Sequence, residues 1–426
     1  MRLVADRNGK SIEMALFQTL QLSERRLGAW LHDTRPALEN VPCTDDAWAG
    51  FADNAADAGL AALVLDHASL NGVELPSICR ERLRAAAMTV AVRHLNMMRE
   101  LERIVQAFNH AGVPVMLLKG AALNLTVYER ADQRPMSDLD LLVKPEHVRE
   151  ALALLRENGC TAGYDLIRDD FFPRYHYEVE LFSGGPRPVR LDLHARPFRP
   201  LRLAGIIADD ALWHGAGAMR LGKAEAFIPR AELMFLQLAG HAGFHGCSRL
   251  IWLYDLKRLV KHYGSSLDWS LILQFAQRWR LSRAVLYAIV QTEELLGPAF
   301  PPAARADLRT HPANWQDRWT LRQAPKDAAS PLVHLTCNLL CTPGVRFRLG
   351  YLMAHLFPGP KHLGENYPYR HYGWISCARV LRAFRGLSKV LALPLYGIAA
   401  VFETVIQRCG QFRCAPTGQC ELNLEP

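Results

Sequence analysis

The sequence predicts an α+β fold in which a sheet lies between N- and C-terminal helical regions. Short apolar runs that fit buried strands occur between residues 115 and 194. On both sides of this stretch, apolar residues recur at helical spacing instead. The chain has 426 residues, of which 50% are hydrophobic and 22% are charged. This composition is typical of a globular protein with a sizeable core.

The N-terminal region, residues 1–108, is predicted to be helical. Apolar residues fall at helical spacing in 61–65 and 88–92, with a break at Asn71-Gly72-Val73. The first ten residues include the charged residues Arg2, Asp6, Arg7 and Lys10 and contain no apolar segment of signal-peptide length. We therefore expect no export by that route and a cytoplasmic location.

The predicted core, residues 109–225, opens with a strand that turns into a helix at Gly120. The apolar run Val115–Leu118 ends at Lys119-Gly120, and the residues after it favour a helix. The start of such a helix carries partial positive charge and unpaired N–H donors, and a glycine lets a phosphate approach closely. Lys119 would add a positive charge. A Lys-Gly pair alone is more often a plain turn, because the P-loop spacing is absent.

Two carboxylates are expected on one face of the next strand, Ser137–Val143. The two-residue period of a strand puts Asp138 and Asp140 on the same side. A divalent cation would remove the repulsion between them, and Mg²⁺ combines one or two carboxylates with phosphate oxygens and water. Mn²⁺ is the alternative ion. An Asp-Leu-Asp tripeptide alone is more often the solvated face of an edge strand, so the prediction depends on its surroundings.

A helix over residues 144–157 should follow that strand and cover one face of the sheet. Pro145 and Glu146 suit its first turn, because proline needs no hydrogen-bond donor there and glutamate complements the positive helix end. Asn158-Gly159 is a stop signal.

A third carboxylate, Asp192, lies on a predicted hairpin. The runs 175–182 and 188–194 fit two strands, and a Gly-Gly-Pro turn separates them. Arg190, Asp192 and His194 would share one face of the second strand, near the centre of the sheet. Asp192 could then complete a second metal site, and Arg190 would add a cation.

The region 226–340 is predicted to be helical and to begin with one or two helices over Ala231–Val260. His241 and His245 are four residues apart and so share a helix face. A zinc-protease role fails, because the catalytic base would stand at position 242, which is alanine. Two roles stay open for this pair: a structural network, or contact with a nucleotide or an acceptor.

The C-terminal region, residues 341–426, is basic. It contains ten Lys or Arg, four Glu and no Asp, so its net charge is +6 and it carries most of the chain's total charge of +8. A basic amphipathic helix is predicted over 379–391, followed by an apolar stretch that ends at Phe402. That stretch is shorter than the roughly 20 residues that cross a bilayer. Peripheral membrane contact through 379–402 and packing of a solvated basic helix on a core are both open, the second being favoured.

Ten cysteines are scattered along the chain, and most should be reduced thiols in the core. The last three, Cys409, Cys414 and Cys420, do not have the paired short spacings of a structural zinc site.

Three motifs, taken in order, resemble the nucleotidyltransferases of the DNA polymerase beta type: Lys-Gly-Ala before a helix, Ser-Asp-Leu-Asp on a strand and a later Leu-Asp-Leu-His. More narrowly, roughly residues 45 to 300 are similar to a bacterial group of uncharacterised nucleotidyltransferases with an LKG turn, R-x-M-S-D-L-D and D-L-H. The resemblance implies the small mixed sheet of that superfamily as the core. It also implies that His241 and His245 lie near the substrate cleft.

The resemblance further implies roles for individual residues. Gly120 would belong to the phosphate-binding turn, Asp138 and Asp140 would be the paired metal ligands, and Asp192 would be the third acidic residue. The nucleotide-binding residues are predicted as Lys119, Gly120, Ser137 and Arg190. Many relatives of the beta type have Gly-Ser or Gly-Gly at the turn, whereas this chain has Gly120-Ala121.

The predicted reaction moves a nucleoside monophosphate from an NTP, such as ATP, to a hydroxyl of a small molecule or protein, and pyrophosphate leaves. Asp192 would complete a second metal site or accept the proton of the nucleophile. A catalytically silent NTP-binding sensor or scaffold is the alternative. Nucleic acid is disfavoured as a partner, because no dense stripe of basic and aromatic residues lies beside the carboxylates.

Overall fold

The computed structural model describes residues 44–162, 177–198, 200–203, 205–208, 210–311 and 344–356, together with a few single positions. Up to Ala354, these residues belong to one compact unit, Thr19–Ala354. The predicted basic helix, the membrane-contact segment 379–402 and the three C-terminal cysteines lie outside the described residues.

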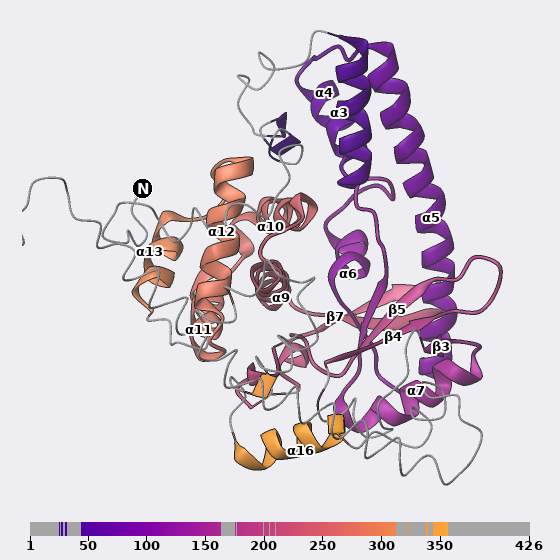
Figure 1. Cartoon of the computed structure of the whole chain (residues 1–426), viewed down its shortest axis with the longest axis vertical. Helices are drawn as coiled ribbons and strands as arrows, with labels where there is room; N and C mark the ends of the chain where they lie inside the picture. Colours follow the sequence, from indigo (N-terminus) through magenta and orange to yellow (C-terminus); the bar gives the residue numbers. More distant parts are fainter. Residues whose placement is uncertain are drawn as a thin grey trace, which may run out of the picture. The chain divides into compact units, whose positions relative to one another are not determined.

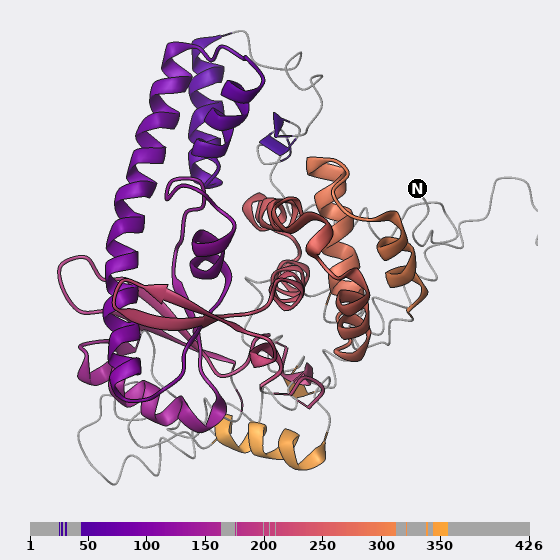
Figure 2. The same cartoon turned by 180° about the vertical axis from the view of Figure 1, so that it is seen from behind.

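In the described residues, the N-terminal part contains the helices α3 (Asp45–Asp57), α4 (Ala61–Leu70) and α5 (Ser77–His110), in agreement with the predicted helical region. Helices α3 and α4 pack against one end of α5, and the rest of α5 runs alongside the sheet (Figures 1 and 2). The buried side chains of α5 recur at helical spacing, as at Leu101 and Phe108. This stripe faces the sheet, and α5 also contacts the helix over residues 148–157.

The core is a mixed sheet of seven strands, which agrees with the predicted α+β fold. The strands are β1 (Met116–Leu117), β2 (Leu139–Leu142), β3 (Thr161–Ala162), β4 (Glu178–Phe182), β5 (Arg190–His194), β6 (Gly217–Leu221) and β7 (Ala224–Ile228). Their order is β3-β4-β5-β2-β1-β7-β6. β2 pairs in parallel with β5 and β1 with β7, and all other neighbours are antiparallel. The β6–β7 hairpin was not predicted.

The predicted strand-to-helix turn and the predicted hairpin are both present. Helix α6 (Lys119–Thr126) begins two residues after β1, and β4 joins β5 through residues 183–189. The helix expected over 144–157 consists of a 3-10 turn (Pro145–His147) and α7 (Val148–Glu157).

A group of helices follows the sheet. Its members are α9 (Ala231–Phe244), α10 (Leu250–Tyr263), α11 (Trp269–Arg278), α12 (Ser282–Leu296) and α13 (Pro302–Thr310). Helix α9 is buried almost all round and packs against α6, α10, α11 and α12. Because it contacts α6 on one side and the other helices elsewhere, α9 joins the helical group to the sheet region (Figure 1). Helix α16 (Val345–Leu356) ends the described part.

Short 3-10 turns occur at Leu201–Leu203, Ala211–Trp213 and Gly264–Ser266.

Within the described residues, Cys79, Cys160 and Cys247 are free and buried, as expected for core thiols. Burial raises the pKa of the Cys79 thiol to about 11. No helix of the described part has the length and apolar composition needed to cross a membrane.

Candidate active site

The strand register brings the three predicted aspartates to one region of the sheet. Asp140 on β2 lies directly opposite Asp192 on the parallel strand β5. Asp138 comes immediately before β2, two residues from Asp140, so it belongs to the same face. Asp140 and Asp192 are buried, with 2% and 3% of their surface exposed, whereas Asp138 is half-buried.

Two nitrogen atoms bind the same oxygen of Asp140. Lys119 Nζ lies 2.6 Å and His194 Nε2 2.8 Å from Asp140 Oδ1. The backbone N–H of Leu118 donates to the Asp140 carbonyl at 3.0 Å, which fixes the start of α6 beside β2. Lys119 has φ +44°, a left-handed conformation that is rare outside glycine and that surrounding contacts must hold in place.

Arg190 lies between the other carboxylates. Its Nη2 is 3.0 Å from Asp192 Oδ2 and 3.9 Å from Asp138 Oδ2, and its Nε is 3.0 Å from Glu180 Oε2. The Ser137 hydroxyl donates to Asp138 Oδ1 at 3.0 Å. The side chains predicted for nucleotide binding therefore interact here with the carboxylates themselves.

Sequence analysis missed Glu178 and Glu180 on β4. Glu180 lies opposite Asp192 and Glu178 lies opposite His194. Glu178 Oε2 is 3.5 Å from His194 Nε2, and the Tyr177 hydroxyl donates to its other oxygen. The two-residue period of the hairpin was the available signal, because it assigns both glutamates to one strand face.

The site holds more negative than positive charge, and the aspartates respond differently. Burial opposes ionisation of Asp140, but the charge of Lys119 and the hydrogen bond from His194 outweigh it and hold its pKa well below the usual range. Burial and repulsion from Glu178 and the other aspartates raise the pKa of Asp192 to about 7, against the opposing effect of Arg190. Burial and the neighbouring Asp140 also raise the pKa of Asp138.

The donor chemistry of this face fits Mg²⁺ or Mn²⁺. Within the described residues, no three His, Cys, Asp or Glu side chains are already arranged around a common metal position. However, carboxylate oxygens are the ligands that Mg²⁺ prefers, and Asp138 and Asp192 already share a positive group, Arg190 Nη2. A divalent cation held by Asp138, Asp140 and Asp192 would supply the same counter-charge.

Gly120 has a packing role at the predicted phosphate turn. It is buried, and a Cβ added there would lie 3.0 Å from Met136 Cγ. The N-cap residue of α6 is Leu118, whose side chain makes no hydrogen bond to the first N–H groups of the helix.

A buried ion pair holds the segment that leads to Asp138. Arg134 Nε donates to both carboxylate oxygens of Asp255 on α10, at 2.7 and 2.9 Å, and the Tyr128 hydroxyl donates to Oδ1 at 2.7 Å. Asn124 on α6 donates to the carbonyls of Gly120 and Arg134. The helical group therefore fixes the segment between α6 and β2.

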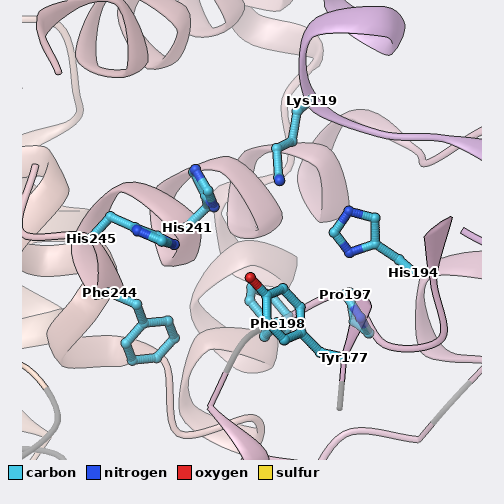
Figure 3. Close-up of a pocket in the computed structure, with 8 residues that line it drawn as sticks. All are labelled: Lys119, Tyr177, His194, Pro197, Phe198, His241, Phe244 and His245. Carbon is cyan, nitrogen blue, oxygen red and sulfur yellow. The ribbon is translucent and has the colours of Figure 1, made fainter. Parts of the chain in front are cut away.

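A pocket lies beside Asp140, and the predicted pair His241 and His245 lines it (Figure 3). Its lining residues are Lys119, Tyr177, His194, Pro197, Phe198, His241, Phe244 and His245. The ring of His241 on α9 and that of His245, the residue that follows α9, lie 4.4 Å apart between centroids, and both contact the Trp252 ring. The sheet and the end of α9 thus supply opposite walls.

Comparison with protein families matches residues 44–297 to a family described as uncharacterised nucleotidyltransferases. The comparison with curated proteins found no match. The matched segment covers more than half of the chain and contains α3 to α12, including every residue of the site. The chain therefore belongs to this uncharacterised nucleotidyltransferase family.

Proposed function

We propose that the protein transfers a nucleoside monophosphate from an NTP to a hydroxyl of a small molecule or protein, with Mg²⁺ or Mn²⁺ at Asp138, Asp140 and Asp192. Membership of a nucleotidyltransferase family supports nucleotidyl transfer in general. The observation that carries the site is the register of β2 and β5, which puts Asp140 directly beside Asp192. A bound divalent ion would neutralise the triphosphate and the charge that develops on it.

In this reaction the acceptor oxygen bonds to the α-phosphorus of the NTP while the bond from that phosphorus to the pyrophosphate oxygen breaks. The acceptor loses its proton, and Asp192 is the group we assign to receive it, since its carboxyl is in the buried cluster at the sheet centre. Lys119 and Arg190 would turn from the carboxylates to the phosphates, where their charges favour departure of pyrophosphate. The uncapped start of α6 would add N–H donors.

The test is incubation with each α-labelled NTP, Mg²⁺ and a cell extract, followed by a search for labelled products. We expect label transfer with wild type and none with Asp138→Asn. Asp132→Asn is the matched control, because Asp132 is in the same segment and pairs with Arg130 rather than with the cluster. Transfer that survives Asp138→Asn rejects the site. NTP binding without transfer from any of the four nucleotides supports the silent sensor instead.

A further inference from the structure

Helix α5 carries a second apolar stripe, on the face opposite to the one that it buries. Leu83 and Leu101 belong to the buried face, and α3 and α4 pack on that side (Figures 1 and 2). Met88, Val92 and Leu95 have 66%, 51% and 57% of their surface exposed. At about 100° of turn per residue, these three side chains project from the other side of the helix. A contiguous exposed apolar stripe indicates an interaction site.

The spacing of the stripe is that of a seam between two helices. Ala85, which is also exposed, Met88, Val92 and Leu95 follow one another at intervals of three, four and three residues. This strict alternation gives the narrow line along which one helix packs on another, narrower than the apolar face that packs a helix on a core. The spacing therefore favours another helix as the partner of α5.

Contacts beside the stripe fix the direction in which it faces. Arg93 Nη2 donates to the carbonyl of Ser137 at 3.2 Å, and Arg82 Nη1 lies 2.6 Å from Asp53 Oδ2 of α3. A rotation of α5 that turned the stripe inward would break both contacts and would expose the buried face instead. The stripe therefore stays on the outside of the described unit.

The stripe is complementary to a second copy of itself in the antiparallel direction. A two-fold axis through Val90 pairs each residue with the one equally far along the helix on the other side of Val90. Met88 then lies opposite Val92 of the second copy, and Ala85 lies opposite Leu95. A small side chain faces a large one in the second pair, so the two helices can interdigitate along the seam.

Charged residues at the ends of the stripe set the direction of the pairing. Glu81 precedes Ala85 by four residues, Arg99 follows Leu95 by four, and both are exposed. The same two-fold axis puts each Glu81 opposite Arg99 of the other copy, which is an attractive pair. Parallel helices would instead put glutamate on glutamate and arginine on arginine, and both pairs repel.

We infer that two copies of the chain associate through α5, antiparallel, about a two-fold axis at Val90. The seam consists of Ala85, Met88, Val92 and Leu95 from each copy. This interface is isologous, because the same residues of both copies form it. The inference does not rest on the proposed function, since none of these side chains belongs to the carboxylate cluster.

Sedimentation velocity of the full chain over a series of concentrations tests the interface. We expect wild type to dimerise, and Leu95→Glu to raise the dissociation constant at least tenfold, because each dimer would bury two carboxylates in the seam. Leu349→Glu is the matched control: Leu349 on α16 is 56% exposed, so the substitution adds the same charge away from α5 and should leave the constant unchanged.

A charge exchange tests the direction of the helices. Glu81→Arg and Arg99→Glu should each raise the dissociation constant about fivefold, since the dimer contains the pair twice, and the double variant should return it to the wild-type value. Parallel helices would not give this rescue, because like charges would face each other in every variant. A dissociation constant that is the same in wild type and both single variants overturns the antiparallel seam.

Two other outcomes also overturn the inference. One is a wild type that stays monomeric at every concentration. If Leu95→Glu then also lowers the melting temperature while Leu349→Glu does not, the stripe is covered by another segment of the same chain. The other is a dimer that Leu95→Glu and Leu349→Glu weaken equally, because the association would then depend on net charge rather than on α5.

Discussion

At the scale of single residues, the site is organised by a shortage of positive charge. Asp138, Asp140, Asp192, Glu178 and Glu180 all lie near one sheet face, and the basic groups that pair with them are Lys119, Arg190 and His194. Removing one partner of a buried ion pair is expensive, because the remaining charge stays out of water. Each of these basic groups therefore affects both the stability of the fold and the affinity of the site for added cations.

Lys119 should be the cation whose loss most weakens the fold. Lys119→Met leaves the buried Asp140 with only His194, and we expect the free energy of unfolding to fall by about 3 kcal/mol. Urea denaturation followed by tryptophan fluorescence measures this change. Lys223→Met, at an exposed position, is the control and should stay within about 0.5 kcal/mol of wild type. Similar values for the two variants would show that the Lys119–Asp140 pair contributes little.

Arg190 should compete with a divalent ion for the same carboxylates. Arg190→Gln removes a positive charge that lies 3.0 Å from Asp192 and 3.9 Å from Asp138, so we expect Mn²⁺ to bind about tenfold more tightly, or about 1.4 kcal/mol. Electron paramagnetic resonance of free Mn²⁺ measures the affinity directly and does not require catalysis. Arg130→Gln, on the surface beside Asp132, should not change the affinity. Weaker Mn²⁺ binding in Arg190→Gln would mean that Arg190 supports the metal rather than replacing it.

The sequence was informative about the aspartates and less so about their partners. A two-residue period suffices to put Asp138 and Asp140 on one strand face, but neither this period nor the hairpin specifies the pairing of β2 with β5 that brings Asp192 beside Asp140. The bond between Lys119 and Asp140 depends on a left-handed backbone at Lys119, which no residue pattern specifies. Whether the three aspartates hold a metal remains a prediction.

At the scale of elements, α9 is the helix that shapes the site, and its glycines permit this. Gly240 makes room for Phe198 at the pocket, and Gly243 lets α9 approach the backbone of α12, where an added Cβ would lie 2.5 Å from the Ala284 carbonyl oxygen. A helix with such contacts on several sides cannot accept a larger side chain at these positions without moving. Its glycines are thus set by tertiary packing rather than by helix propensity.

One substitution made in two helices should have opposite effects. Gly243→Ala puts a methyl group into the α9–α12 contact and should lower the free energy of unfolding by about 1–3 kcal/mol. Gly50→Ala, in α3 with nothing within 4 Å of the added Cβ, should raise it by about 0.5–1 kcal/mol. Thermal denaturation of both variants shows whether each substitution stabilises or destabilises the protein relative to wild type. Stabilisation by Gly243→Ala would show that α9 and α12 can separate at little cost.

The helices were predictable because their signals are local. The break at residues 71–73 and the stop at Asn158-Gly159 lie where α4 and α7 end. The β6–β7 hairpin, with strands 217–221 and 224–228, was missed because neither strand has a continuous apolar run: β6 is largely exposed, and the exposed Glu225 interrupts β7. The division of the chain at residue 225 also stays a prediction, although β7 crosses that position.

At the scale of the whole compact unit, the helical group and the sheet region depend on each other. The α6–α9 packing and the Arg134–Asp255 pair join residues more than 100 positions apart in the sequence. Sequence patterns could not predict this joint, because it requires knowing which helix packs against which strand. Helical spacing alone could place His241 only on a helix face. The expectation that it lies near the cleft came from the resemblance to a family.

The Arg134–Asp255 pair gives the sharpest test of that dependence. Asp255→Ala leaves the guanidinium of Arg134, a residue only 7% exposed, without its carboxylate, and should lower the free energy of unfolding by about 3–5 kcal/mol. In Arg134→Met/Asp255→Ala neither charge remains, so the double variant should be more stable than Asp255→Ala alone. Urea denaturation of wild type, both single variants and the double variant measures the coupling. Strictly additive losses would mean that the segment leading to Asp138 is held by packing, and that the ion pair is not what joins the helical group to the site.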